Sequence, residues 1–346
     1  MMMHAPPDSS LSDRAAAAAD REPPLISVVV PVYKEEGSIR PFLARAVSVL
    51  ERLGTYEIIF ALDPSPDQTE RVIRDEIARN KNIGLLVFSR RFGQPAATMA
   101  GVFNCRGRWC VVIDVDLQDP PEMIETIWRK AQEGFDVVTT HRTSREGETV
   151  MKLIVSWVGY RFLNRFAQVP IRRDSGDFRI MSRRMVEELR GLSENHGFMR
   201  GLIGVVGFPQ AEVLYERAAR HAGAGKYNRY LGSVKIAFDG IFGFSTFPLQ
   251  VMMWTGFSLA LLSAFAILVV FAMKIWHGNA YPMGIPTITV LVLFIGGVQL
   301  AAVGVLGEYI GRIYDEVRRR PPYIIDQAVN VEVRDPRGPR SGTRSA

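Results

Sequence analysis

The sequence has 346 residues, of which 47% are hydrophobic, and a formal net charge of +6 at pH 7. This length is enough for one large domain or two. No basic stretch is interleaved with stacking aromatic side chains, so the positive charge indicates anionic lipid and phosphate partners and argues against nucleic acid. The two cysteines, Cys105 and Cys110, match neither a disulfide framework nor a metal site. We expect both to be reduced and partly buried.

The N-terminal half alternates between strand-like and helix-like segments. Residues 1–24 precede this pattern; they combine an alanine run with charges and prolines, which predicts disorder, and they lack the apolar segment of a signal peptide. Apolar, β-branched runs then predict strands at residues 25–32, 56–62, 83–88, 109–113 and 136–140, with helices between the first four. This alternation predicts an α/β fold with a Rossmann-like, mostly parallel sheet and right-handed crossovers.

The fourth predicted strand ends in two carboxylates, Asp114 and Asp116, and Pro120 and Pro121 then open a helix. Ligands of open α/β sheets bind beyond the carboxyl ends of the strands. Two carboxylates at that edge suit a hard divalent cation, Mg²⁺ or Mn²⁺, and through it a diphosphate. The competing interpretation is an aspartate pair that only caps a turn. The sequence has no P-loop and no Gly-rich dinucleotide motif after the first strand, so a nucleotide would be held through the metal.

Two uncharged stretches follow in the C-terminal half. No Lys, Arg, Asp or Glu lies between Asp239 and Lys274, or between Lys274 and Glu308. Each stretch exceeds the roughly 20 apolar residues that span a bilayer. We therefore predict two transmembrane helices, at residues 247–273 and 286–309, with a cytoplasmic tail at 310–346 that is flexible beyond Tyr323. A buried hairpin of a soluble protein is the alternative.

Charges around these spans predict their orientation. The short loop between them carries Lys274 and His277, whereas both outer flanks are rich in Arg and Lys. By the positive-inside rule, both termini and the domain at residues 25–230 face the cytoplasm. Residues 150–168, with aromatic side chains among basic ones, predict a helix in the membrane interface or on the sheet surface. Residues 231–246 predict a second interfacial helix.

Several loops carry candidate phosphate ligands. Arg142 and Arg145 follow the fifth strand, and a guanidinium group matches phosphate oxygens bidentately, although a solvated loop would look the same. Between these loops, residues 174–179 are predicted to form a tight acidic turn, which is not a phosphate ligand. The Gly-rich segment around Lys226 is typical of a mobile loop that closes over a phosphate. Arg200 and Lys226 could each neutralise either phosphate.

These motifs together resemble a known family. The resemblance covers residues 26–325 and is to polyprenyl-phosphate glycosyltransferases of the inverting family 2, with the A-type fold. This group includes dolichyl-phosphate mannose synthase and bacterial undecaprenyl-phosphate glucosyl and aminoarabinosyl transferases. The matching segments are VPVYKEE at 30–36, SRRFGQ at 89–94, DVDLQDPP at 114–121, SGDFR at 175–179, FMRG at 198–201 and GEYIGRIY at 307–314.

Two segments depart from the family pattern. After the second strand the family has D-D-G-S, but here Leu62 replaces the first acidic residue and Pro64 replaces the glycine. Asp63 is the one carboxylate left for recognising the nucleotide base. The family loop G-E-S-K-Y becomes Gly223-Ala224-Gly225-Lys226-Tyr227, without its carboxylate and hydroxyl. An unusual donor sugar would account for both changes.

The resemblance implies transfer of a sugar from a nucleotide sugar, UDP-linked in most members of this shape, to polyprenyl phosphate at the bacterial inner membrane. Asp116, with Asp114 and Gln118, would hold Mg²⁺ or Mn²⁺, and Asp177 would be a catalytic carboxylate. A homotetramer is also implied. The donor site would comprise Pro31, Tyr33, Glu35, Asp63, Arg91, Gln94 and Asp114, and the acceptor phosphate would bind Arg142, Arg145, Arg200 and Lys226.

Three other functions stay open at this point. One is a catalytically inactive membrane-bound binder of nucleotide sugars, with Leu62 and Pro64 marking a degenerate site. Another is a channel or flippase for lipid-linked sugars, although neither predicted span contains a Lys, Arg, Asp or Glu that would mark an ion path. The last is a processive polysaccharide synthase, for which two spans are too few.

Overall fold

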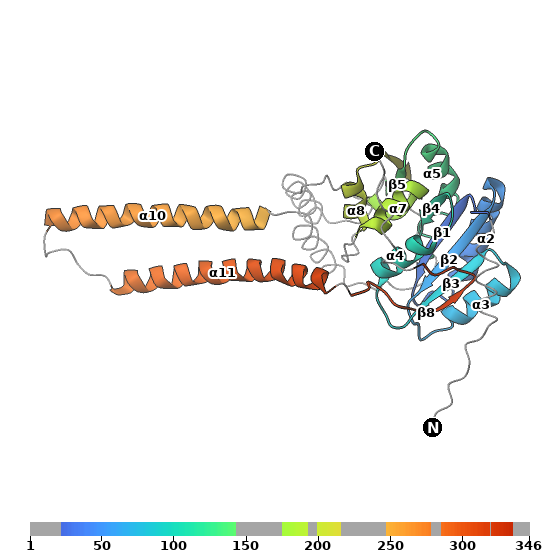
Figure 1. Ribbon diagram of the computed structural model, residues 1–346, viewed down its shortest axis with the longest axis horizontal. Helices are drawn as coiled ribbons and strands as arrows, with labels where there is room; N and C mark the ends of the chain where they lie inside the picture. The colour runs from blue at the N-terminus through green and yellow to red at the C-terminus, as the bar shows by residue number, and fades with distance from the viewer. Residues whose placement is uncertain are drawn as a thin grey trace, which may run out of the picture. The chain divides into compact units, whose positions relative to one another are not determined.

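The structure is a computed structural model that describes residues 22–142, 175–192, 199–215, 247–277, 285–318 and 320–334. Two compact units make up the chain. The first comprises Met1–Ile154, Ile171–Tyr227 and Pro321–Ala346, and the second comprises Val155–Pro170 and Asn228–Arg320. Figure 1 shows the elements of both units.

The first unit is built on an eight-stranded sheet in the order β7-β5-β6-β4-β1-β2-β3-β8. Its strands are β1 (Ile26–Val32), β2 (Tyr56–Leu62), β3 (Ile83–Phe88), β4 (Trp109–Val112), β5 (Val137–Arg142), β6 (Ser175–Ser182), β7 (Gln210–Tyr215) and β8 (Ile325–Val329). Strands β4, β1, β2 and β3 are parallel neighbours, as are β5 and β7. Strands β6 and β8 pair antiparallel with their neighbours. The predicted mostly parallel α/β sheet is therefore confirmed.

Helices cover both faces of this sheet (Figure 1). Helices α2 (Ile39–Leu53), α3 (Thr69–Arg79) and α5 (Met123–Ala131) place apolar side chains in one core with the strands. Helix α4 (Gln94–Asn104) packs on β1 and β2 from the other side, and α7 (Arg183–Gly191) packs beside α4 and α8 (Met199–Val206). A Cβ atom at Gly101 would lie 2.2 Å from Val29, so only glycine permits this approach of α4 to β1.

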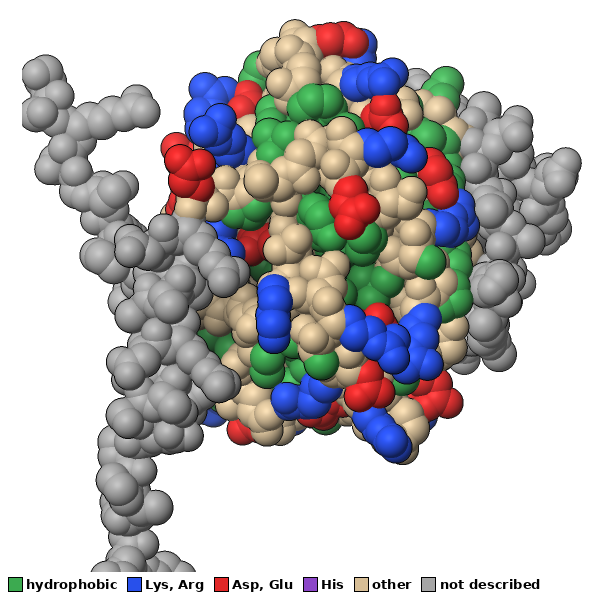
Figure 2. Space-filling view, turned by 90° about the vertical axis from the view of Figure 1, so that its right-hand side faces the viewer, with side chains coloured by type: hydrophobic (Ala, Val, Ile, Leu, Met, Phe, Trp, Pro, Cys, Tyr) green, Lys and Arg blue, Asp and Glu red, His purple; other side chains and the backbone are tan. Residues whose placement is uncertain are grey.

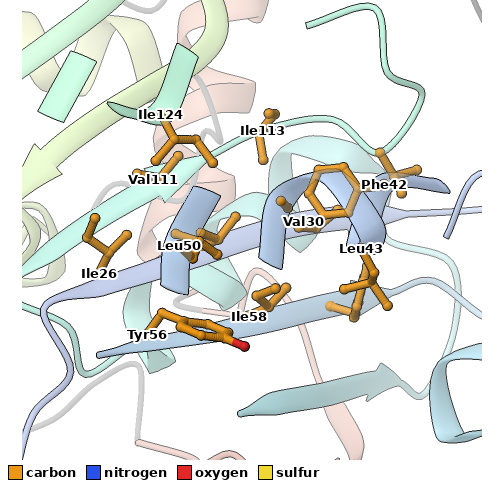
Figure 3. Packing of buried hydrophobic residues seen from close by; sticks show 14 of the residues in the cluster. Ile26, Val30, Phe42, Leu43, Leu50, Tyr56, Ile58, Val111, Ile113 and Ile124 are labelled. Carbon is orange, nitrogen blue, oxygen red and sulfur yellow. The ribbon is translucent and has the colours of Figure 1, made fainter. Parts of the chain in front are cut away.

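The core between α2 and the sheet follows from helical periodicity. Buried residues recur in α2 three and four positions apart, the pattern of a helix with one apolar face. Figure 3 shows Phe42, Leu43 and Leu50 directed at Val30 and Ile58 of the strands. Phe42 and Phe60 meet edge to face, with ring centroids 6.5 Å apart. Strands β1, β2 and β3 are buried along their whole length, which explains their continuous apolar sequences.

A polar network lies near the amino end of the same strands. Glu57 accepts hydrogen bonds from the Ser27 hydroxyl at 2.6 Å and the Arg106 backbone N–H at 2.7 Å, and it pairs with the Arg106 guanidinium at 3.2 Å. The Ser27 hydroxyl also accepts the N–H of Gly107 at 2.7 Å. Because its hydrogen bonds are satisfied, this buried carboxylate stabilises the turn before β4.

Both cysteines are free thiols, and both are fully buried, so the expectation of partial burial was wrong. Cys105 follows α4 and Cys110 lies in β4. The hydrogen bond with Cys105, together with burial, raises the pKa of the Cys110 thiol well above its usual range. A thiol in that state is a poor nucleophile.

The surface in Figure 2 carries basic side chains interspersed with acidic ones. Ion pairs of this kind connect the exposed helices, for example Arg45 of α2 with Glu122 before α5, at 2.6 Å. The hydrogen bond with Arg45 lowers the pKa of Glu122, and the same bond raises the pKa of Arg45. Such exposed pairs contribute little to stability.

Two segments differ from the predictions. Ser175–Ser182 is a strand, so Asp177 and Arg179 lie in the sheet and not in a tight turn. Pairing with β4 on one side and β5 on the other overrides the turn-forming tendency of the Ser-Gly-Asp sequence. The segment beyond Tyr323 is not a flexible tail throughout, because Ile325–Val329 forms β8 on the edge of β3.

The second unit contains two long helices, α10 (Phe247–His277) and α11 (Ile285–Val317). Within the described residues one stretch, Phe294–Val317, is long and apolar enough to cross a membrane, with a mean hydropathy of 1.4. It overlaps the predicted span at 286–309 but ends later, since α11 continues to Val317. The expected pair of spans is thus not confirmed as a pair, although residues 247–273 are helical.

Other predictions concern parts of the chain outside the described residues. These are most of the N-terminal tail, the segments 150–168 and 231–246, the Gly-rich loop with Lys226, and Arg145.

Candidate active site

The carboxyl ends of β4, β1, β2 and β3 meet at one edge of the sheet, because these strands are parallel neighbours. The residues that follow them are polar. Tyr33 to Glu36 follow β1, Asp63 follows β2, Ser89 to Gln94 follow β3, and Asp114 and Asp116 follow β4. The fold therefore brings the predicted donor-site segments together.

Asp114 and Asp116 differ in exposure. Asp114 is half-buried, and its Oδ1 accepts a hydrogen bond from Nε2 of Gln94 at 2.9 Å. Asp116 is 6% exposed, and its Oδ1 accepts the backbone N–H of Gln118 at 3.1 Å. Leu117, directly after Asp116, has a φ of +60°, a strained conformation for a bulky side chain and one that is enriched at functional sites.

These residues suit a divalent cation that is shared with a substrate. Among the described residues, no group of three or more His, Cys, Asp and Glu side chains is close enough to enclose a metal. Mg²⁺ is usually held by one or two carboxylates and completes its coordination with water and substrate phosphates. Asp114 and Asp116 fit that donor set, so a cation here would depend on the diphosphate.

Asp63 has a different environment from the one predicted for a base-recognition residue. It is 3% exposed, and its two carboxylate oxygens accept the backbone N–H groups of Phe92 and Gly93, each at 2.9 Å. Gly93 has a φ of +93°, a conformation that favours glycine. Asp63 therefore connects the end of β2 to the loop that follows β3.

A second network joins the loops after β1 and β2. Asp67 accepts hydrogen bonds from the hydroxyls of Ser65 at 2.5 Å and Thr69 at 2.8 Å. These hydroxyls in turn accept the backbone N–H groups of Lys34 at 3.0 Å and Glu35 at 2.9 Å. Lys34 has a φ of +56°, so the network supports a strained residue at the site. Burial opposes ionisation of Asp67, but the hydrogen bonds from Ser65 and Thr69 outweigh it and lower the pKa of Asp67.

The aromatic and basic side chains of these loops stack on one another. The Arg91 guanidinium lies 4.1 Å from the ring centre of Tyr33, and the Arg90 guanidinium lies 3.9 Å from that of Phe92. Tyr33 is half-buried at the same edge, as a side chain that contacts a nucleotide should be. Pro31, by contrast, is buried within β1, so its side chain belongs to the sheet.

Asp177 lies on β6, the strand next to β4. Val112, the last residue of β4, pairs with Arg179 in the antiparallel register, and Asp177 lies two residues before Arg179 on β6. On its other side, β6 has an irregularity: Thr139 pairs with Arg179, but His141 pairs with Ser175. Such a β-bulge redirects side chains and is common beside active sites. The fold therefore places Asp177 on the strand next to β4, which the acidic pair follows.

The predicted acceptor-phosphate ligands are placed only in part. Arg142 is the last residue of β5 and Arg200 lies in α8, but their side chains, like Arg145 and Lys226, are outside the described structure.

The sequence analysis did not identify three residues that support this site. Arg179 pairs with Asp177, Asp67 organises the loops, and the buried Asp119 accepts a hydrogen bond from the Tyr215 hydroxyl at the end of β7. Arg179 and Asp119 lie within the motif segments at 175–179 and 114–121, whereas Asp67 lies outside the quoted motifs. The Asp119–Tyr215 contact joins distant parts of the chain and leaves no local signal.

Comparison with known proteins identifies the family. The model described as "Glycosyl transferase family 2" matches residues 27–190, the part of the chain that carries β1 to β6. The bactoprenol glucosyl transferase of Shigella phage SfII is 39% identical over 305 residues, which cover 88% of this chain and 98% of that protein. This chain belongs to glycosyl transferase family 2.

Other members extend this likeness. The prophage bactoprenol glucosyl transferase homolog of Escherichia coli K12 is 39% identical, over 87% of this chain and 98% of that protein. Among solved structures, glucosyl-3-phosphoglycerate synthase from Mycobacterium tuberculosis, in complex with Mn²⁺, UDP and glucosyl-3-phosphoglycerate, is 20% identical. That match covers 70% of this chain and 84% of that chain, with a TM-score of 0.43. The protein is a family 2 glycosyltransferase, and its mostly parallel α/β sheet agrees with the fold that the resemblance implied.

Proposed function

We propose that this glycosyltransferase moves a sugar from a UDP-linked donor to polyprenyl phosphate, with inversion and with a divalent cation, at the cytoplasmic face of a bacterial inner membrane. The product would be a lipid-linked sugar that serves cell-envelope glycan or lipopolysaccharide modification.

One observation carries this proposal. Asp114 and Asp116 follow β4 at the edge where the parallel strands end, and Asp177 lies on β6, the strand next to β4. A family 2 enzyme needs a cation site for the donor diphosphate and a polar group near the acceptor, and this arrangement supplies residues for both.

The donor would bind across the loops after β1, β2 and β3. Asp114 and Asp116, with Gln118, would hold Mg²⁺ or Mn²⁺ against the diphosphate. When bound, the cation would stabilise the negative charge on the leaving nucleoside diphosphate. Tyr33, Glu35, Arg91 and Gln94 would contact the nucleotide and sugar, whereas Asp63 would act by holding the Ser89–Gln94 loop through its two hydrogen bonds.

The names of the bactoprenol glucosyl transferases support a polyprenyl acceptor and a glucosyl donor. In the reaction, an acceptor phosphate oxygen forms a bond to the anomeric carbon as the bond to the donor diphosphate breaks. The electron pair of the broken bond leaves on the nucleoside diphosphate. A phosphomonoester has a second pKa of about 6, so this nucleophile is already charged at pH 7 and hardly needs a general base. Asp177 would orient the acceptor more than deprotonate it.

Basic residues would bind the acceptor phosphate. Arg142 is the last residue of β5, next to β6, and Arg145 follows it three residues later in the sequence. Guanidinium groups suit phosphate oxygens. Arg200 and Lys226 would complete the charge balance. These four assignments rest on the sequence and on chemistry.

The apolar helices would bring the enzyme to its lipid substrate. Phe294–Val317 of α11 is one membrane span in this proposal. Residues 247–273 of α10 contain no Lys, Arg, Asp or Glu and would form the other span. In chain order α10 would lead out of the cytoplasm and α11 would return to it. A homotetramer stays a hypothesis.

The test is a transfer assay with detergent-purified full-length protein, undecaprenyl phosphate, Mn²⁺ or Mg²⁺, and a panel of nucleotide sugars. Mass spectrometry should detect one metal-dependent lipid-linked sugar, and Asp116→Asn should abolish it. If folded wild-type protein made no product from any donor, a binder without catalysis or a lipid transporter would become the better description.

A further inference from the structure

Arg179 is a buried charge in the middle of the site. Its side chain is 3% exposed, and its backbone pairs with Val112 of β4 on one side and Thr139 of β5 on the other. A charge removed from water is costly unless it is paired and hydrogen-bonded. The groups that contact the guanidinium therefore indicate what this residue does.

The guanidinium contacts one residue twice. Nη2 donates to Oδ1 of Asp177 at 3.0 Å, and Nε donates to the backbone carbonyl oxygen of the same residue at 3.1 Å. Arg179 thereby restrains both the main chain and the side chain of Asp177. The planar guanidinium group is suited to such a two-point contact, and the ammonium of a lysine cannot reproduce it.

The two partners differ sharply in exposure. The Asp177 side chain is 50% exposed, whereas that of Arg179 is 3% exposed. The ion pair thus has a buried anchor and an open end at the edge of the sheet. The exposed carboxylate lies in the bulge of β6, where the regular ladder with β5 is interrupted between the pairs of Thr139 and His141. At this point the sheet ladder gives the side chain less support than elsewhere.

We infer that Arg179 is a positioning residue that holds the Asp177 carboxylate in its working orientation, through Oδ1 and the backbone carbonyl. Arg179 does not touch the substrate in this account; it acts through Asp177. The inference rests on the proposed function, in which Asp177 orients the acceptor.

Arg179→Lys tests the inference because lysine keeps the positive charge but cannot make both hydrogen bonds of the guanidinium group to Asp177. Misplacement of a catalytic group by about 1 Å can cost about 10²-fold in rate. We expect kcat to fall by about 10- to 100-fold while the donor KM changes by less than about threefold, since the donor loops lie on other strands.

The matched control is Arg106→Lys. Arg106 is also largely buried and paired with a carboxylate, Glu57, at 3.2 Å, but this pair lies near the amino end of the strands. A loss of folded protein would affect both variants, so kcat is expressed per folded enzyme. Arg106→Lys should leave kcat per folded enzyme unchanged. Equal losses of kcat in the two variants would overturn the inference.

A double-mutant cycle with Asp177→Asn gives a second readout. If Arg179 acts through Asp177, the double variant should be no slower than Asp177→Asn alone, because the group that Arg179 positions is already disabled. Additive losses would overturn the inference. Arg179→Gln, which keeps an amide donor, takes the place of the lysine variant if that one does not fold. Wild-type protein without transfer activity would contradict the proposed function, whereas active wild type with an equally active Arg179→Lys would contradict only the role of Arg179.

Discussion

The Asp63 carboxylate accepts the backbone N–H of Gly93 at 2.9 Å, although the two residues follow different strands of the sheet. Its other oxygen accepts the N–H of Phe92 at the same distance. The geometry of the donor loop thus depends on a buried carboxylate at the end of β2. In the family pattern this region is assigned to base recognition, and here its remaining carboxylate supports a loop.

Asp63→Asn should therefore weaken donor binding without removing a catalytic group. Asparagine has one acceptor oxygen, so one of the two backbone N–H groups loses its partner, at a cost of about 1–3 kcal/mol. We expect the donor KM to rise several-fold with kcat nearly unchanged, as measured by steady-state kinetics. A large fall in kcat at unchanged KM would show that Asp63 takes part in the reaction itself.

Divalent cation should be required through Asp114 and Asp116. Chelation with EDTA should abolish transfer, and added Mn²⁺ or Mg²⁺ should restore it. Asp116→Asn should lower activity by about 10²-fold or more and raise the cation concentration needed for half-maximal rate, since Asp116 would supply one of the two negative charges proposed to hold the cation. Full activity in EDTA would contradict the cation site.

Stability should depend on pH through Asp67. Its pKa is lowered from the ordinary value of 3.8, so the folded state favours the ionised form. The stabilisation is complete above the unfolded pKa and is lost as pH falls through the lower, folded value. Asp67→Asn should lower the melting temperature at pH 6 and make it less dependent on pH below about 4. Thermal unfolding between pH 3 and 6 measures this, and parallel curves for the two proteins would contradict the assignment.

The chain beyond α11 should support the donor loop. Tyr323 is 3% exposed and packs against Phe88 with ring centroids 6.1 Å apart, and the N–H of Ser89 donates to the carbonyl of Ile324 at 3.0 Å. Tyr323→Ala should destabilise the first unit by about 3 kcal/mol and speed hydrogen exchange in residues 89–94. Tyr314→Ala, at a side chain 57% exposed on α11, is the control. Unchanged exchange in residues 89–94 would show that the loop is independent of the C-terminal segment.

Membrane topology can be read from single cysteines. In a Cys105→Ala, Cys110→Ala background shown to be folded, a cysteine at Asn279 should react with an impermeant maleimide added outside intact cells. A cysteine at Glu332 should react only after permeabilisation. This pattern requires two spans. Protection of position 279 would leave the single span at Phe294–Val317.

The sequence was sufficient for the elements with strong local patterns. Strands β1 to β4 are apolar runs bounded by turn residues, and their ends fall within a residue or so of the prediction. Strand β8 was missed because its sequence, Ile-Asp-Gln-Ala-Val, is half polar and its partner β3 lies more than two hundred residues earlier. The start of β6 was read as a turn, because Gly176 and Asp177 favour turns until two neighbouring strands pair with them.

In the candidate site, too, residues in local motifs could be predicted, whereas contacts between distant segments could not. Asp114, Asp116 and Asp177 could be named as candidates because each stands in a short motif; the structure places the first two after β4 and the third on the neighbouring strand β6. The supporting contacts were not found. The pairing of Asp119 with Tyr215 and the bonds from Asp63 to the loop after β3 depend on which strands are neighbours, and no local pattern encodes this.

Phosphorus NMR of a complete reaction tests the central claim most directly. The mixture contains full-length enzyme, a divalent cation, undecaprenyl phosphate and the UDP-sugar selected by the donor panel. We predict that one sugar–polyprenyl phosphodiester forms for each UDP released, while the phosphomonoester signal of the acceptor falls by the same amount. UDP release without a matching phosphodiester would contradict transfer to polyprenyl phosphate and would make the protein a hydrolase or a transferase for another acceptor.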